Sequence, residues 1–235
     1  MLALGGSALL GLALASALVA CWALFAVAVR GGPPGLARLG RRALTGGTLL
    51  VGAACALLVG ALLADQFGVR YVALHSARAL PAYLKFSALW AGQEGSLLLW
   101  SLLQAGAATL VVHARGGLHP LGEWAGAYLC VAATFFIALT LLLANPFVPS
   151  APVPPDGQGL HPLLRHVAMA LHPPVLYLGY VGLSVPFGLA LAALTTGSTD
   201  AFSTAARAWT LGAWVFLGLG LLLGARWAYD VLGWG

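Results

Sequence analysis

One histidine in this sequence lies where its imidazole is well placed to bind a metal ion. His172 follows a proline-rich stretch and precedes Pro173, Pro174 and a long apolar segment. Proline is tolerated in the first turn of a helix, so the two prolines predict a helix start with His172 at or near the N-cap. There the positive end of the helix dipole disfavours imidazolium, and neutral imidazole is the form that binds metals. The alternative is a helix-end histidine that hydrogen-bonds the preceding loop.

Aromatic residues near His172 extend this chemistry to haem. Tyr180 falls on the same predicted helical face as His172, so the two side chains are expected to line one cavity. Three further aromatic residues follow the last apolar segment on the same side of the membrane: Trp227, Tyr229 and Trp234. A flat porphyrin needs such a platform, and Arg226 is available to pair with a propionate, although an interfacial aromatic belt explains the same pattern. From the residues alone, ligation of a metal or haem by His172 and the helix-end alternative stay equally open.

Other reactive groupings are missing from the sequence. No Ser-His-Asp spacing, paired carboxylates or metalloprotease motif occurs, and the acidic residues lie near the ends of apolar segments. Cys21, Cys55 and Cys130 each lie inside an apolar run without a Cys-x-x-Cys pair, which predicts buried thiols and disfavours a disulfide framework or zinc site. Hydrolytic chemistry is therefore disfavoured.

The composition is that of a membrane protein. Hydrophobic residues make up 61% of the chain and charged residues 7%, whereas soluble domains carry about 25% charged residues. The net charge of +5 is therefore interpreted as a signal of membrane topology and not of nucleic-acid binding. The first apolar run lacks a basic n-region and is too long for a signal peptide, so it predicts a retained membrane span.

Apolar runs of about 20 residues predict an all-α integral membrane protein, with residues 1–235 forming a single transmembrane domain. Its bundle of about six transmembrane helices has spans over about 6–29, 43–64, 96–113, 123–144, 172–194 and 208–227. Residues 65–95 are divided by Pro81 into two short pieces, of which the second is expected to lie flat at the interface. Residues 145–171 form a long proline-rich loop, a kind that is more often functional than connective.

The distribution of basic residues orients the predicted bundle. The loop expected between Arg30 and Arg42 carries four arginines and no acid, which favours the cytoplasmic side. This orientation places both termini, the interfacial helix, the proline-rich loop and His172 on the outer side. Three basic residues in the segment 65–95 oppose the trend, but the four-arginine stretch is the denser signal.

Four motifs occur in the order and spacing of one known family. Trp90-Ala91-Gly92-Gln93-Glu94-Gly95-Ser96-Leu97-Leu98-Leu99-Trp100 resembles a Trp-Gly-Gly-His-Glu-Gly-Ser-Leu-Leu-Leu-Trp signature. Asn145-Pro146-Phe147 and Asp156-Gly157-Gln158-Gly159-Leu160-His161-Pro162-Leu163-Leu164 resemble its next segments. They are followed by His172-Pro173-Pro174 with Leu176-Tyr177 and Gly179-Tyr180-Val181-Gly182, and then by Trp227-Ala228-Tyr229 with Leu232-Gly233-Trp234-Gly235, which is similar to the entry to a Trp-rich WWD region. The chain is identified as resembling the N-terminal portion of CcmF, the haem lyase subunit of system I cytochrome c maturation, or of its NrfE paralogue.

This resemblance implies an enzyme of the bacterial inner membrane, a haem lyase component that acts within a complex. Such proteins receive haem from the chaperone CcmE and apocytochrome c through CcmH/CcmI-type subunits. They promote thioether bonds between haem and Cys-x-x-Cys-His motifs at the outer face. His172 corresponds to an axial histidine that holds the incoming haem, with Tyr180, Trp227, Tyr229 and Trp234 as the aromatic surroundings. An embedded haem b is expected to need residues beyond 235.

Some positions depart from the family pattern. Ala91 and Gln93 replace the usual Gly and His, so no haem role is transferred to position 93. His161 stands where Asn is usual and is an alternative outer ligand. Two other functions stay open, a haem exporter or CcsA-type haem-handling protein and an unrelated membrane transporter that uses a kink at Pro186. A transporter is disfavoured because the sequence lacks the mid-membrane charged residues that ion-coupled carriers usually need.

Overall fold

Six long helices form the molecule, as the sequence predicts. The computed structural model describes residues 1–114 and 121–233. The long helices are α1 (Leu2–Arg30), α2 (Pro34–Leu63), α5 (Gln93–His113), α6 (Gly122–Leu142), α7 (Val167–Thr196) and α8 (Thr199–Leu232). Each is long and apolar enough to cross a membrane. These helices confirm the all-α membrane fold, and each predicted span overlaps one of them.

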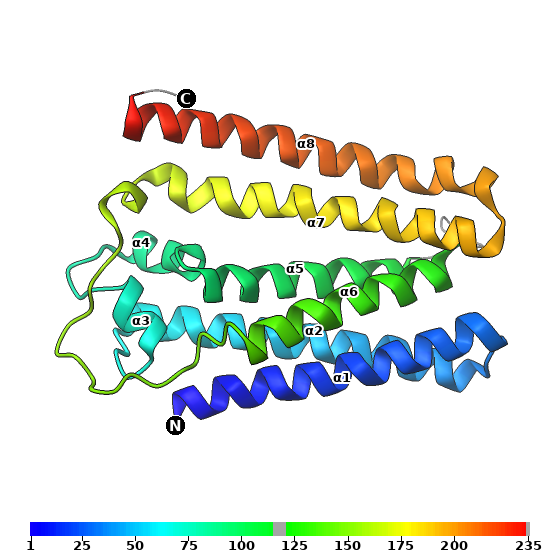
Figure 1. The fold of residues 1–235 in the computed structure, drawn as a ribbon, viewed down its shortest axis with the longest axis horizontal. Coiled ribbons are helices and arrows are strands. Elements are labelled where there is room, and N and C mark those ends of the chain that lie inside the picture. Colours follow the sequence, from blue (N-terminus) through cyan, green and yellow to red (C-terminus); the bar gives the residue numbers. More distant parts are fainter. Residues whose placement is uncertain (115–120, 234–235) are drawn as a thin grey trace.

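The six helices run side by side along the long axis of the molecule (Figure 1). α1 packs against α2 and α6, α5 packs between α2 and α6, and α7 packs against both α5 and α6. α8 lies at the edge of the bundle, and its only extensive contact with another described element is with α7. The α7–α8 pair is therefore a helical hairpin on the side of a four-helix group.

The start of α1 and the end of α8 lie at the same end of the bundle, at the left of Figure 1. We call this the terminal end. It also carries the short helices α3 (Arg70–His75), α4 (Ala82–Ser87), η1 (Ala88–Trp90) and η2 (Pro162–Leu164). The predicted short helical piece after Pro81 is thus present as α4 and η1.

Three helices, α2, α7 and α8, begin five or more residues before the predicted spans, and α2 and α8 include residues expected to form loops. α2 starts at Pro34, and only residues 31–33 connect α1 to α2. The prediction of a loop that continues through Arg42 is therefore wrong. Gly31 ends α1 with a left-handed backbone (φ 61°), and proline suits the first position of a helix because its missing N–H has no partner there. α8 likewise starts at Thr199, so its first turns contain polar residues that were expected to form a connection. Polar residues occur both in loops and in helix ends that extend beyond the membrane, so composition alone does not distinguish the two.

The proline-rich segment after α6 is pinned to the short helices of the terminal end. Backbone N–H groups of Arg70 and Ser150 join it to the segment around α3, and Gln158 donates its N–H to the carbonyl of Ala73 at 2.8 Å. Asp156 accepts the backbone N–H of Arg78 at 3.0 Å and that of Gly157. These two hydrogen bonds hold the pKa of Asp156 below its usual value. The long loop is therefore an ordered cover over α3.

A mostly buried ion pair fixes α4 to the end of α2. The ammonium Nζ of Lys85 lies 2.7 Å from each carboxylate oxygen of Asp65, although Lys85 is only 7% exposed. Asp65 has a left-handed backbone (φ 53°), a conformation that aspartate and asparagine tolerate better than most residues. The pair ties the chain together where α2 leaves the bundle.

We expect Lys85→Met to lower the free energy of unfolding by about 3 kcal/mol, because it leaves the Asp65 carboxylate without its cation. The measurement is the thermal unfolding midpoint of the purified protein in detergent. Asp65→Asn combined with Lys85→Met is the matched control, since it removes both charges and keeps a residue suited to the left-handed backbone. The expectation fails if the single and double variants unfold at the same temperature.

Candidate functional site

His172 lies in the second turn of α7 and not at the helix start. The helix begins at Val167, and the N-cap is His166, whose Nδ1 accepts the N–H of Ala168 at 3.1 Å. The prediction that His172 caps this helix is therefore wrong, and Pro173 and Pro174 lie inside it. His172 therefore also lies beyond the first turn, within which the helix dipole mainly acts.

A tryptophan from another element explains how α7 accommodates Pro173. Proline has no N–H, so the carbonyl of Met169, four residues earlier, lacks its helical partner. The indole Nε1 of the buried Trp90 donates to this carbonyl at 2.7 Å. The first sequence motif and the histidine segment are thus joined by one hydrogen bond. Sequence reasoning missed this contact, although a proline inside an apolar helix signals a carbonyl that needs another donor.

The segment from Trp90 to Ser96 folds tightly around Tyr71 and positions that tryptophan. The Tyr71 hydroxyl lies 2.8 Å from the carbonyl oxygen of Ala88 and accepts the N–H of Gly92 at 3.0 Å. Burial raises the pKa of Tyr71, so the phenol stays protonated as a donor. Ser96 Oγ donates to the Trp90 carbonyl at 3.1 Å.

The imidazole of His172 faces α8. Its Nδ1 lies 2.8 Å from the carbonyl oxygen of Gly220. A carbonyl only accepts, so Nδ1 carries the proton and donates, which leaves Nε2 with a free lone pair in the neutral ring. The ring centroid lies 5.8 Å from that of Trp227, at an interplanar angle of 47°. A half-buried imidazole with one nitrogen fixed by a backbone carbonyl is the usual arrangement of a metal-binding histidine.

Trp227 connects the histidine to a small apolar cavity at the terminal end. Its Nε1 donates to the carbonyl of Leu163 at 3.3 Å, and it lines a cavity of about 400 Å³ with Leu164 and Val231. His161, the alternative outer ligand, lies on the wall of the same cavity. Its Nδ1 accepts the N–H of Leu163 at 3.3 Å. Trp227 therefore contacts the His172 ring and lines the same cavity as His161.

The other predicted site residues do not gather around His172. Tyr180 stacks on Trp100 of α5, with ring centroids 6.0 Å apart, because eight residues turn a helix by about 80° relative to His172. Tyr229 is 61% exposed and lies about half a turn round α8 from Gly220. The expectation that His172 and Tyr180 share a cavity is therefore not met. Trp234 lies outside the described residues.

Arg226, offered as a propionate partner, already has a carboxylate partner. Its Nε donates to Asp230 Oδ2 at 2.8 Å, one turn further along α8. The same Asp230 oxygen lies 3.7 Å from Nε2 of His166, so the pair also joins α8 to the start of α7. The Arg226 side chain remains 71% exposed and accessible to a second anion.

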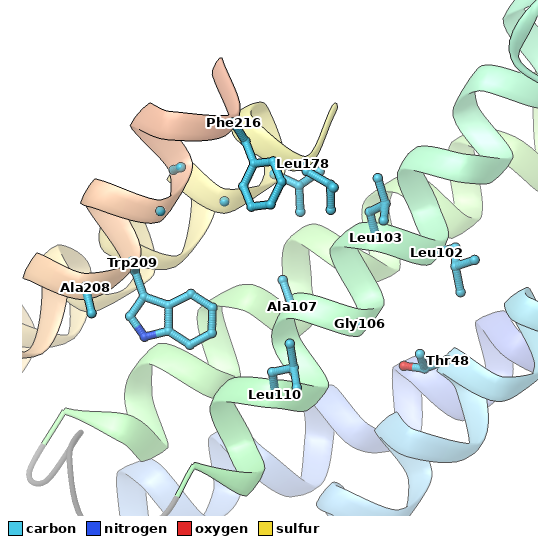
Figure 2. A pocket seen from close by; sticks show the side chains of 14 residues that line it. Thr48, Leu102, Leu103, Gly106, Ala107, Leu110, Leu178, Ala208, Trp209 and Phe216 are labelled. Atoms are coloured by element: carbon cyan, nitrogen blue, oxygen red, sulfur yellow. The ribbon is translucent and has the colours of Figure 1, made fainter. Parts of the chain in front are cut away.

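A second cavity, of about 670 Å³, lies between α5 and the α7–α8 pair (Figure 2). Trp209 and Phe216 of α8 form one wall, and Leu103 and Leu110 of α5 form the other. Its lining contains no titratable side chain, and the hydroxyl of Thr48 is satisfied by the Leu44 carbonyl at 2.9 Å. This cavity offers an apolar surface but no acid, base or ligand.

The donor set at the terminal end suits haem iron better than a free metal ion. Among residues 1–114 and 121–233, no three His, Cys, Asp or Glu side chains lie close enough to hold a metal ion. Haem iron already has four porphyrin nitrogens, so a single protein imidazole suffices for an axial bond. Nε2 of His172 meets that requirement, and Trp227 supplies an aromatic face beside it.

Comparison with known proteins agrees with this chemistry. Residues 90–235 match the family described as "Cytochrome C assembly protein", which is more than half of the chain. This chain belongs to the cytochrome c assembly family. The matched region includes Trp90 and His172, and thus the hydrogen-bonded link between their segments.

Several members of the cytochrome c assembly family are named for cytochrome c biogenesis. The chain is 46% identical over 181 residues to "Cytochrome c-type biogenesis protein CcmF" of Pseudomonas aeruginosa, which covers 76% of this chain and 28% of that protein. It is 37% identical over 190 residues to "Cytochrome c-type biogenesis protein NrfE" of Haemophilus influenzae, covering 80% of this chain and 30% of that protein. A solved structure, "Cytochrome c Heme Lyase CcmF", superposes with a TM-score of 0.84 at 33% identity, covering 100% of this chain and 37% of that one. The resemblance to CcmF and NrfE is confirmed, and the chain spans about a third of the length of these relatives.

Proposed function

We propose that this chain is the haem-holding part of a CcmF-type cytochrome c haem lyase. The observation that carries the proposal is the His172 imidazole, whose Nδ1 is fixed by the Gly220 carbonyl while Nε2 keeps its lone pair. In this proposal Nε2 of His172 binds the iron of haem that arrives as a substrate. Trp227 contacts the porphyrin, and the apolar cavity beside it receives part of the macrocycle.

In this proposal the protein contributes to the reaction by holding the haem in a fixed orientation relative to the thiols. The thiols of a Cys-x-x-Cys-His motif add across the haem vinyl groups. Each addition breaks one S–H bond and the π bond of one vinyl group, and forms one carbon–sulfur and one carbon–hydrogen bond. Holding the porphyrin by one axial bond and one aromatic face converts this encounter into a reaction between oriented groups. Tyr229, Trp234 and the exposed Arg226 guanidinium are proposed to contact the outer part of the porphyrin.

The proposed partners follow from the same role. Haem comes from the chaperone CcmE, and apocytochrome c is presented by CcmH/CcmI-type subunits. The ordered proline-rich cover and the short helices of the terminal end supply the surface on which they dock. A resident bis-histidine haem b is proposed to need ligands from outside residues 1–235.

The proposed location is the bacterial inner membrane, with the terminal end facing outward. The support is the charge at the opposite end, where Arg30, Arg38, Arg41 and Arg42 lie at the α1–α2 turn without an acidic residue nearby in sequence. Both termini, His172 and the cavity next to Trp227 are then on the outer side, where apocytochrome c is modified.

Deletion of the gene in its host tests the proposed function. We expect covalently bound haem in c-type cytochromes, measured by haem staining after denaturing electrophoresis, to fall by at least about tenfold. The expected reason is that thiols and vinyl groups are no longer brought together. A plasmid copy of the intact gene restores staining, and spectra of b-type cytochromes stay unchanged as the control for haem synthesis. Normal staining of c-type cytochromes in the deletion strain contradicts the proposal.

A further inference from the structure

The ring of His172 lies against a glycine of α8, Gly224, and leaves no space there for a larger residue. A Cβ at Gly224 would lie 2.6 Å from Cε1 of His172 and 3.0 Å from Nδ1. The first distance is shorter than any that real Cβ atoms show, and the imidazole is held by its hydrogen bond on the same side. The ring therefore occupies the volume that a side chain at Gly224 would take.

A second glycine brings the accepting carbonyl within reach of the ring. A Cβ at Gly220 would lie 2.8 Å from Cα of Leu176, so the backbones of α7 and α8 approach closely at this point. Small residues four apart are a common means of close helix contact in membranes. Here the close contact places the Gly220 carbonyl oxygen 2.8 Å from Nδ1 of His172. Gly220 and Gly224 thus act together on one side chain.

We propose that Gly220 and Gly224 are positioning residues that form a seat for His172. The Gly220 carbonyl selects the tautomer with the proton on Nδ1, and the missing side chain of Gly224 admits the ring in one orientation. The seat thereby presents Nε2, and not Nδ1, to a ligand. That Nε2 binds haem iron rests on the proposed function. The positioning of the ring by Gly220 and Gly224 does not depend on it.

Outer partners of a histidine ligand strongly affect metal affinity. They fix the ring and its tautomer, and their loss typically lowers affinity or activity by 10- to 100-fold. A methyl group at Gly224 forces the ring to turn or withdraw, which breaks the hydrogen bond to Gly220 without altering His172 itself. Gly224→Ala is therefore the variant that separates the seat from the ligand.

The experiment uses the whole polypeptide purified from its membrane, labelled with ¹⁵N-histidine and assigned with a His172→Gln sample. In the wild type we expect Nδ1 of His172 to be protonated and Nε2 to be unprotonated, as read from nitrogen chemical shifts. Gly224→Ala is expected to shift this signal to a mixture of both tautomers. Haemin titrated into the same samples is expected to bind 10- to 100-fold more weakly to Gly224→Ala than to the wild type.

Gly218→Ala is the matched control, since Gly218 lies on the same helix with no atom within 4 Å of a Cβ. It is expected to leave both the nitrogen shifts and the haemin affinity unchanged. If Gly224→Ala changes neither the tautomer of His172 nor the affinity for haemin, the proposed seat is wrong, even if haemin still binds through His172. A second outcome is that Gly224→Ala changes the tautomer but the wild type binds no haemin through His172. This result supports the seat and contradicts the proposed function.

Discussion

Replacing His172 with alanine is expected to abolish cytochrome c maturation while leaving the protein in the membrane. The variant loses the nitrogen proposed to hold the haem iron, and misplacement of a reacting group by about 1 Å already costs about 100-fold in rate. We therefore expect covalent haem in c-type cytochromes to fall at least about 100-fold. The measurement is haem staining of a strain whose own gene is deleted and which carries the variant on a plasmid.

His113→Ala is the matched control for this experiment. Its Nδ1 also bonds a backbone carbonyl, that of Thr109 at 2.9 Å, but it lies at the last residue of α5, at the end of the bundle opposite to His172. Cytochrome c levels in this variant should equal those of the wild type. Immunoblots of membranes show whether each variant is present in normal amount. Wild-type haem attachment with His172→Ala removes the basis for its role as ligand.

Gly95→Ala is expected to destabilise the protein strongly, by about 3 kcal/mol or more, which is the upper range for overpacked sites. Gly95 is buried in the first turn of α5, and a Cβ there would overlap the carbonyl oxygen of Leu89 and the hydroxyl of Tyr71. A backbone carbonyl cannot move aside as a flexible side chain does. The measurement is the thermal unfolding midpoint in detergent, together with the amount of protein that reaches the membrane.

Gly106→Ala on the same helix provides the comparison, because no atom lies within 4 Å of a Cβ at that position. Alanine is the better helix former by about 1 kcal/mol, so this variant should be as stable as the wild type or slightly more stable. The two substitutions are chemically identical and differ only in what the new methyl group meets. Equal unfolding midpoints for both variants show that the turn around Tyr71 relaxes at little cost.

The number of helices and their approximate spans could be predicted from sequence, because the apolar length needed to cross a bilayer is a local property. The starts of α2, α7 and α8 could not. α2 and α8 begin with proline or polar residues beyond the apolar run, and such residues are compatible with both a loop and a helix end. α7 begins five residues before His172, because Pro173 and Pro174 lie inside the helix and do not mark its start. In α7 the decisive contacts were a cap from His166 and a donor from Trp90, which is distant in sequence.

The candidate site was predictable in its central residue but not in its surroundings. His172 and Trp227 do lie together, as their positions on one side of the membrane suggested. Tyr180 does not join them, because helical periodicity gives the direction of a side chain but not the neighbour that it meets. Gly220 and Gly224 carried no signal in a sequence rich in glycine, since their role depends on which ring packs against them.

The edge position of α8 has a mechanical consequence. The His172 ring, the Gly220 carbonyl, Gly224 and Trp227 all belong to the α7–α8 hairpin, so none of their mutual distances crosses the boundary with the four-helix group. If the hairpin tilts as a rigid body against that group, the imidazole and its surroundings move together and keep their geometry. Such a movement strains the bond from Trp90 to the Met169 carbonyl, which does cross the boundary. This bond, together with the packing of α7 on α5 and α6, therefore resists such a movement.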